Sequence, residues 1–368
     1  MSLPSVEGCR NLYVHFPFCR RKCSYCALHS RVGVSVADRD GYVRRLARAV
    51  AGLPEALAGR LETVYFGGGS PALCELEPLF STLRPLLAGS GRVEFTVELH
   101  PLDVTDDLLE RLRMGGVNRI SMGVQSLDDA VLRQMRRGYD AVGAERAFAC
   151  VRRHFDNAGI DLIVGYPGEP DDWSGIGARL GSWGLSHCSV YSLILEEKSL
   201  LARWLQKGDA TGLTGSLPTD GQTMDRLAAV AEGLRTLGLE RYEISSYALR
   251  GRECRHNLAV WRGEDYLGLG EGAFGRLGLA RTRHAWGADD VAWGLPTEIE
   301  WVKPERDRQE RRLFRLRTRE GLDAGGRPDW QRSLVKFEAE GLLRREGDVF
   351  FLTPRGCEVC DSLLVDLV

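Results

Sequence analysis

The sequence predicts an α/β protein in which parallel strand–helix units form a TIM-like barrel, followed by a mainly helical, winged-helix-like domain. Two observations predict the barrel. Short strand-like segments alternate with helical stretches over most of the chain, which is typical of parallel βα units. Glycines or polar residues also stand at the expected strand ends, as they do at the mouth of a barrel. A change to charged helices and one short strand from about residue 296 predicts the second domain.

The first strand is expected at residues 12–16, where apolar and polar side chains alternate before Pro17 ends the segment. A helix with an acidic start follows at 38–47. The later barrel strands are expected at 63–66, 93–98, 119–124, 159–164 and 189–195, with helices around 105–115, 128–136, 141–155, 172–184 and 222–237. Their regular alternation favours a single parallel sheet.

Two domains are therefore expected, a barrel with an extension over residues 1–295 and a C-terminal domain over 296–368. A charged helix opens the second domain near Lys303, and a short strand is expected at 349–354. Helices followed by a small hairpin indicate a winged-helix-like shape. That shape often binds DNA, but the balanced charge of the chain favours a packing or lid module.

Composition and charge describe an ordinary globular chain of 368 residues, 43% of them apolar. Its 49 basic and 51 acidic residues give a net charge of −2, which argues against a dedicated nucleic-acid-binding protein. No apolar run approaches the ~20 residues of a membrane span, and the N-terminus lacks the pattern of a signal peptide. We therefore expect a cytoplasmic protein, in which ten cysteines indicate metal or redox chemistry before disulfides.

Three of the cysteines fall within eight residues, as Cys19-x3-Cys23-x2-Cys26. They lie on a loop that also carries the cations of residues 20–22. A structural zinc site needs four ligands, usually as two separated pairs. Three close thiolates instead suit an iron–sulfur cluster with one iron left open to another ligand, and the cations would offset the negative charge of the cluster. We predict these three cysteines as metal ligands.

A second pair, Cys357 and Cys360, lies in an expected C-terminal amphipathic helix. The sequence shows no partner ligands for a second metal, so packing is the favoured interpretation. The other five cysteines stand alone and are interpreted as small core residues.

Chemistry-bearing residues recur at the ends of the expected strands. After the cysteines come Gly67–Gly69, Glu98, Gln125 and Asp161. In a TIM-like barrel these ends converge on one mouth, where sites are built. A glycine triplet lets backbone amides approach a ligand closely, although alone it indicates a tight turn. Single polar residues are as often caps or loop hydrogen bonds, but their recurrence favours a site.

The cysteines and glycines belong to a longer series of motifs: Tyr-Val-His-Phe-Pro-Phe-Cys (13–19), Gly-Gly-Gly-Ser-Pro (67–71), Gly-Val-Gln-Ser (123–126), Asp-Leu-Ile-Val-Gly-Tyr-Pro-Gly (161–168), Tyr-Glu-Ile-Ser-Ser-Tyr-Ala (242–248), His-Asn-Leu-Ala-Val-Trp (256–261) and Tyr-Leu-Gly-Leu-Gly-Glu-Gly-Ala (266–273). In this order they resemble the radical S-adenosylmethionine (SAM) enzymes. More narrowly, they resemble the oxygen-independent coproporphyrinogen III oxidase-like family and its heme-chaperone (HemW) branch. The resemblance runs from residue 11 to the C-terminus and implies a partial (β/α)6 radical SAM barrel.

The resemblance also implies the cofactors. Cys19, Cys23 and Cys26 would hold a [4Fe–4S] cluster whose fourth iron chelates the amino and carboxylate groups of SAM. Three residues would line this SAM: Tyr13, Gly68 and Glu98. Six more match positions that bind a second SAM in the coproporphyrinogen oxidases: Tyr25, Gly69, Ser70, Gln125, Arg137 and Asp161. Reductive cleavage of SAM to methionine and a 5′-deoxyadenosyl radical requires a dry barrel interior.

Departures from the family motifs bear on the branch. The oxidases carry a further cysteine two places after the third, where this chain has Leu28. They also have a long N-terminal extension, whereas this chain reaches its first expected strand by residue 11. Both differences favour the heme-chaperone branch. The chaperone motif His-Asn-x-x-Tyr-Trp resembles residues 256–261, but Val260 replaces its tyrosine, and Phe274 stands where histidine is common. His256 is therefore interpreted either as a heme ligand or as a hydrogen-bonding structural residue.

The leading hypothesis is a heme chaperone that binds the cluster, SAM and heme. Its expected partners are a heme acceptor of the respiratory-enzyme type and an electron donor such as flavodoxin or ferredoxin, with no nucleic acid; peripheral membrane association stays open. One alternative is a catalytic radical SAM enzyme, either a coproporphyrinogen III decarboxylase or a two-SAM methyltransferase or cyclopropanase. Retention of Gln125, Arg137 and Asp161 keeps it open. Another is a winged-helix regulator with a sensory cluster, against which the near-neutral charge argues.

Overall fold

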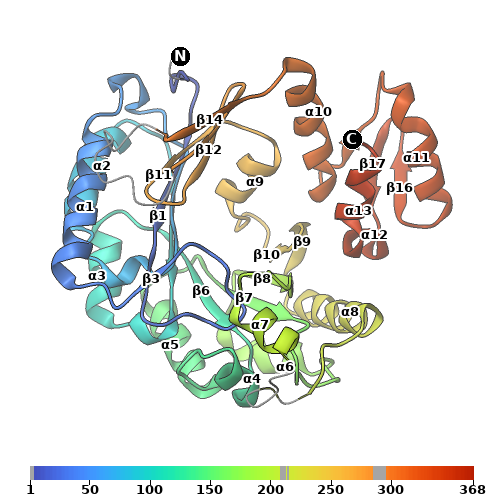
Figure 1. Ribbon diagram of the computed structural model, residues 1–368, viewed down its shortest axis with the longest axis horizontal. Helices are drawn as coiled ribbons and strands as arrows, with labels where there is room; N and C mark the ends of the chain where they lie inside the picture. The colour runs from blue at the N-terminus through green and yellow to red at the C-terminus, as the bar shows by residue number, and fades with distance from the viewer. Residues whose placement is uncertain (1–3, 208–212, 214, 285–295) are drawn as a thin grey trace.

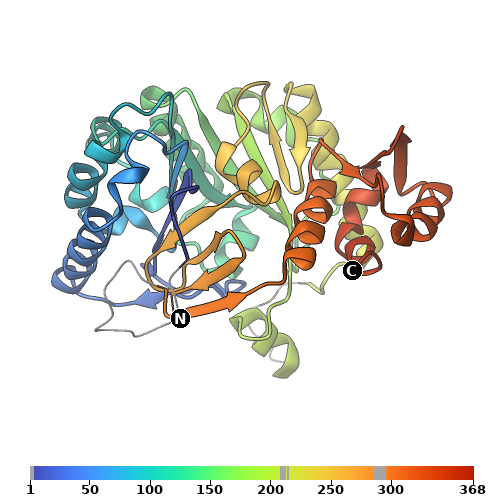
Figure 2. The same ribbon diagram turned by 90° about the horizontal axis from the view of Figure 1, so that it is seen from above.

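Six parallel strands in chain order form the centre of a twelve-stranded sheet in the computed structural model. The structure describes residues 4–207, 213, 215–284 and 296–368. The parallel strands are β1 (Asn11–Phe16), β4 (Thr63–Gly68), β5 (Glu94–Leu99), β6 (Arg119–Gln125), β7 (Ala158–Val164) and β8 (His187–Ser192). Helices lie on the outside of the curved sheet (Figures 1 and 2). The predicted α/β fold with a partial barrel is confirmed.

The barrel helices pack against the sheet. They are α1 (Val36–Ala51), α2 (Glu77–Leu87), α3 (Asp106–Met114), α4 (Asp129–Gln134), α5 (Ala141–His154), α6 (Ile176–Leu180), α7 (Leu200–Lys207) and α8 (Asp220–Thr236). Of these, α1, α3, α4, α5 and α8 begin at a side-chain N-cap. Thr219 caps α8 in a capping box with Gln222, so orphan amides at its start are satisfied. None of the helices that the structure describes combines the length and apolarity needed to cross a membrane.

The expected bounds of three elements differ from those in the structure. The helix expected at 172–184 is α-helical only over Ile176–Leu180 and ends in a 3-10 turn, because Gly184 takes a left-handed conformation (φ 65°) that terminates it. The strand expected at 189–195 ends at Ser192. The C-terminal helix is two short ones, α12 (Pro354–Glu358) and α13 (Cys360–Val365), which meet at the non-helical Val359.

The sheet continues beyond the parallel strands on both sides. On one side, β11 (Tyr266–Leu269) pairs in parallel with β1, and antiparallel strands follow: β12 (Phe274–Leu277), β13 (Ala280–Arg283) and β14 (Glu298–Trp301). On the other side, β10 (Ser246–Ala248) and β9 (Glu240–Glu243) follow β8 in antiparallel pairing. The helix α9 (Arg255–Trp261) contacts β4. A small parallel pair, β2 (Phe18–Cys19) and β3 (Arg31–Val32), encloses the cysteine loop.

The C-terminal unit has its own hydrophobic core, which includes Trp330, Phe337 and Phe350. It consists of α10 (Pro304–Phe314), β15 (Leu322–Asp323), α11 (Pro328–Ala339), β16 (Leu343–Glu346), β17 (Val349–Leu352), α12 and α13. Its strands form a separate sheet in the order β15–β17–β16. Because β14 still belongs to the large sheet, the helical part begins only at Pro304, and the domain division at residue 296 stays a prediction.

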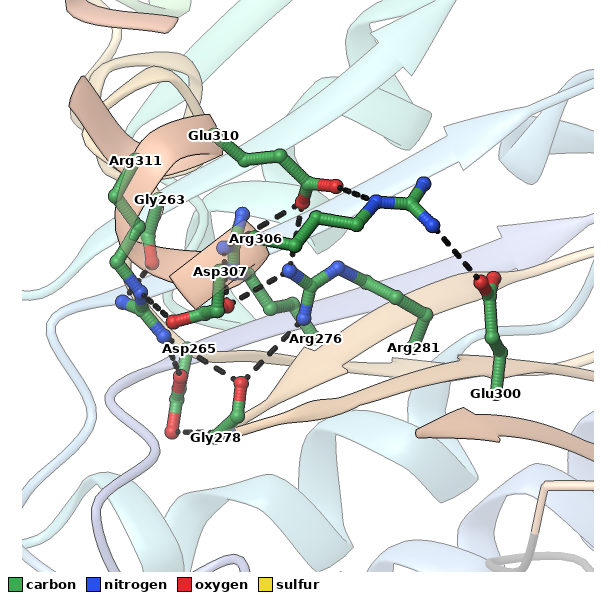
Figure 3. A network of polar contacts seen from close by, with 10 residues as sticks. All are labelled: Gly263, Asp265, Arg276, Gly278, Arg281, Glu300, Arg306, Asp307, Glu310 and Arg311. Atoms are coloured by element: carbon green, nitrogen blue, oxygen red, sulfur yellow. Dashed lines mark hydrogen bonds and ion pairs between the residues drawn. The ribbon is translucent and has the colours of Figure 1, made fainter. Parts of the chain in front are cut away.

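Two sets of contacts join the C-terminal unit to opposite sides of the large sheet. Near β14, Asp307 on α10 accepts hydrogen bonds from Arg276 (2.6 Å), Arg281 (2.7 Å) and Arg311 (2.7 Å), which places three guanidinium groups around one carboxylate (Figure 3). At the opposite edge of the sheet, the segment after α10 pairs with β9. The amide of residue 244 donates to the Arg317 carbonyl at 2.8 Å, and the amide of residue 319 donates to the Tyr242 carbonyl at 2.9 Å.

Candidate metal and cofactor site at the barrel mouth

The cysteine loop leaves the carboxyl end of β1 and is fixed to a neighbouring loop of the barrel. The Ser24 amide donates to the Met135 carbonyl (3.2 Å), and the Ser24 hydroxyl donates to the Gln134 carbonyl (2.9 Å). Cys19, at the end of β2, and the other two cysteines of the motif are half-buried free thiols. Strand pairing and these hydrogen bonds therefore hold the three predicted ligands on one short loop at the mouth.

The surroundings of the thiols fit an iron–sulfur cluster. A Cβ atom on Gly69 would lie 2.9 Å from the Cys19 sulfur, so only glycine lets the backbone pass this close. Burial raises the pKa of Cys19 to about 11, so iron has to displace its proton. In the described part of the chain, no three His, Cys, Asp or Glu side chains are yet arranged around one metal position.

A buried cation, Arg137, stands beside these thiols. It donates to the Cys23 sulfur (3.1 Å), the Tyr25 hydroxyl (3.4 Å) and the Gly123 carbonyl (2.7 Å). Its Nε also donates to the Tyr139 hydroxyl at 2.8 Å. Because the residue is 5% exposed and its guanidinium is held by four groups, Arg137 supplies a fixed positive charge where thiolates and a cluster would be negative.

Glu98 in β5 lies at the centre of the second group of predicted residues, inside the barrel. Its carboxylate accepts from the Tyr65 hydroxyl (2.8 Å) and from the backbone amide of Gly68 (3.0 Å). Gly68 has φ 110°, and a Cβ there would lie 2.6 Å from the His15 ring, so no other residue fits. The Tyr13 ring stacks on that of Tyr65 with centroids 6.0 Å apart. Tyr13, Gly68 and Glu98 therefore share one neighbourhood, and their role in binding SAM stays a prediction.

Two carboxyl groups share the interior. Burial raises the pKa of Glu98 to about 7, and the neighbouring charge of Asp161 adds to this effect. Burial also raises the pKa of Asp161, although the Ser121 hydroxyl donates to it at 3.1 Å and Arg119 opposes the shift. Asp161 lies in the middle of β7 and not at its end. Two carboxyls in a low-dielectric interior resist double ionisation, so a proton is held here near neutral pH.

Three further predicted residues, Gln125, Ser70 and Phe274, lie in different places. Gln125 ends β6 with a positive φ of 69°, which turns the chain toward the loop of Arg137. The Ser70 hydroxyl donates to Asp103 at 2.5 Å, and Arg20 of the cysteine loop also pairs with Asp103. Phe274 instead lies on β12, 58% exposed, beneath the Arg283 guanidinium. A cofactor-binding role for Phe274 stays a prediction.

His256, the predicted heme ligand, is on α9 and is enclosed within the barrel. Its Nδ1 lies 2.7 Å from the Thr63 hydroxyl, and its ring centroid lies 5.1 Å from that of Tyr65. The residue is 5% exposed, and burial lowers its pKa to about 3. Its contacts are those of a hydrogen-bonding residue in an aromatic stack. A role in heme ligation stays a prediction.

Sequence reasoning missed several residues of the site, among them Tyr65, Thr63, Asp103 and Tyr139. Tyr65 could have been found, because it lies directly opposite Tyr13 in the β1–β4 register. Such a position predicts the same face of the sheet. No sequence pattern marks Asp103 or Tyr139 in this way, because their contacts depend on which loops meet in the fold.

Comparisons with known proteins agree with this geometry. The model of the Radical SAM superfamily matches residues 13–174. The heme chaperone HemW of Synechocystis is 31% identical over 328 residues, which cover 84% of this chain and 78% of that one. HemW of Mycobacterium tuberculosis (strain H37Rv) is 30% identical over 375 residues, with 97% and 94% covered. The chain belongs to the HemW family of radical SAM proteins. HemW membership confirms the resemblance predicted from the motifs.

The fold also matches that of a solved structure. Coproporphyrinogen III oxidase (HemN) from Escherichia coli, described as a radical SAM enzyme, superimposes with a TM-score of 0.81. The match covers 99% of this chain and 91% of the other at 20% sequence identity. It shows that the barrel and the C-terminal unit form one shared architecture.

Proposed function

We propose that the chain is a heme chaperone that holds a [4Fe–4S] cluster, binds SAM and delivers heme to an acceptor protein. The observation that carries the proposal is the barrel mouth of a HemW-family chain, where the cysteine loop, Gly69 and the buried Arg137 meet. Leu28 stands where the coproporphyrinogen oxidases carry a further cysteine. This difference favours heme delivery over porphyrinogen oxidation.

The residues at the mouth have separate roles in this proposal. Cys19, Cys23 and Cys26 would hold the cluster, which supplies an electron for cleavage of the C–S bond of SAM. Glu98 would accept a hydrogen bond from a ribose hydroxyl, while Gly68 lets the backbone approach the ligand. The neighbouring stack of Tyr13, Tyr65 and His256 excludes water from the interior. A second group, which includes Tyr25, Gln125 and Asp161, is proposed for a second SAM.

The proposed electron donor is an acidic protein of the flavodoxin or ferredoxin type. The Ser24 hydrogen bonds bring residues 133–136 beside the cysteine loop, and Arg133 and Arg136 are exposed there. Exposed cations attract an acidic partner over long range. The proposed heme acceptor is a respiratory enzyme, and the proposed setting is the cytoplasm, since cluster thiols must stay reduced.

Titration of the apo-protein with hemin tests the heme-chaperone proposal. A saturable shift of the Soret band at about one heme per chain, followed by transfer to an apo-acceptor, is expected. Absence of saturable heme binding would overturn the proposal. Turnover of coproporphyrinogen III to protoporphyrinogen by the anaerobically reconstituted protein, with release of 5′-deoxyadenosine, would show the catalytic alternative to be correct.

SAM affinity is expected to rise with pH through about 7. Below this pH the Glu98 carboxyl, whose pKa burial raises to about 7, is protonated and is a weaker acceptor for a ribose hydroxyl. SAM should therefore bind about tenfold more weakly at pH 6 than at pH 8. Equilibrium dialysis of labelled SAM against the reconstituted protein measures this. Glu98→Gln should bind weakly at both pH values, and a wild-type affinity that does not change with pH would contradict the prediction.

A further inference from the structure

A cavity of about 600 Å³ lies between the barrel and the C-terminal unit, away from the barrel mouth. Its walls come from α8, β9 and β10 on one side and from β17, α12 and the segment after α10 on the other (Figure 1). Ligand sites of ~300–1,000 Å³ are common where two domains meet. The volume and position therefore suit a molecule of cofactor size.

The walls combine apolar side chains with five arginines, which stand among four glutamates. Leu239, Leu316, Phe351 and Leu352 supply much of the apolar surface. Arg319 of the lining pairs with the largely buried Glu253 at 2.8 Å. At the rim, the exposed Arg235 and Arg344 pair with exposed acids of their own elements, Glu232 (2.6 Å, α8) and Glu346 (β16). Exposed pairs of this kind contribute little, so these arginines can exchange partners for carboxylates of a ligand. Apolar walls with a cationic rim suit a flat apolar molecule that carries carboxylates.

A thiol and a guanidinium meet on one wall of this cavity. Cys357 lines it and lies within interaction range of Arg241. The Arg241 Nε donates to the Tyr247 hydroxyl at 2.9 Å, yet no described carboxylate lies within ion-pair distance of Arg241, since Glu358 interacts with it only from farther away. A cysteine thiolate is a known axial ligand of heme iron. Cys360, by contrast, is buried with 3% exposure.

We propose that this cavity holds heme, with the Cys357 sulfur as axial ligand of the iron and the rim arginines as partners of the propionates. On ligation the thiol releases its proton to solvent, and the sulfur donates an electron pair to ferric iron without change of oxidation state. The proposal rests on the proposed heme-chaperone function and places its cargo outside the barrel. His256 is already bound to Thr63 and enclosed in an aromatic stack, so it is not the ligand in this arrangement.

Hemin titration of three variants of the full chain tests the site. Cys357→Ser should weaken hemin binding about tenfold or more and shift the Soret band away from its wild-type position. Ala228→Trp, which projects a bulky ring from an exposed position of α8 into the cavity, should weaken binding without changing any proposed ligand. His256→Ala should keep the wild-type Soret position.

Matched controls separate local from general effects. Cys150→Ser removes a half-buried thiol from α5, and Ala178→Trp adds a ring to an exposed position of α6, both outside the cavity. Both should bind hemin like wild type. Wild-type affinity and Soret position in Cys357→Ser, or loss of hemin binding in His256→Ala alone, would overturn the site. No binding by the wild type would instead reject the heme-chaperone function itself.

Discussion

A Cys23→Ser chain is expected to lose its iron–sulfur cluster, with iron content after anaerobic reconstitution falling from about four atoms per chain to nearly none. The loop motif supplies three thiols, which are all needed to hold a cluster whose fourth iron binds SAM, so the motif has no spare ligand. A serine hydroxyl is a much poorer ligand than a thiolate for iron in such a cluster. Iron and sulfide analysis with the absorption spectrum measures the loss.

A cysteine outside the loop provides the control for the loss of iron. Cys150→Ser removes a half-buried thiol that pairs with Asp106 on the barrel surface, so the iron content should not change. If Cys23→Ser kept a full cluster, another side chain would be the third ligand. The assignment of Cys19, Cys23 and Cys26 would then be wrong.

An Asp307→Asn chain is expected to lose about 3–5 kcal/mol of unfolding free energy. Asp307 is 6% exposed and accepts from Arg276, Arg281 and Arg311, so the neutral amide leaves three guanidinium groups without their shared anion. Glu310 still pairs with Arg281 at 2.8 Å, but it cannot replace the central carboxylate. Urea unfolding at pH 7 measures the change. The C-terminal unit should separate from the barrel in an earlier transition.

The same network predicts an acid-sensitive interface. Burial opposes ionisation of Asp307, but hydrogen bonds from the three arginines outweigh it and lower its pKa. A lowered pKa stabilises the fold above about pH 4, and this contribution is lost as the pH falls through the native pKa. Asp107→Asn, which removes an exposed ion pair with Arg111, should cost less than about 1 kcal/mol. An equal effect of the two substitutions would contradict the argument.

The sequence predicts local structure and clustered chemistry well. The parallel strands were found because their apolar residues are buried on both faces, and the cysteine ligands because their spacing itself carries the chemistry. The strands β9 to β13 were missed, since β11 is placed by pairing with β1 more than two hundred residues earlier. Asp161 was expected at a strand end and lies inside one. Thr63 and His256 meet only because α9 folds back onto β4, which no local pattern encodes.

The two contacts of the C-terminal unit have a consequence for solubility. The twelve-stranded sheet is open, with β14 at one edge and β9 at the other. An uncovered edge strand offers unpaired amides and carbonyls to any other chain. Here residues 317–319 occupy the free side of β9, while α10 anchors the same unit near β14. The C-terminal unit thus prevents another chain from pairing with this edge of the sheet. A chain shortened before Pro304 should therefore self-associate.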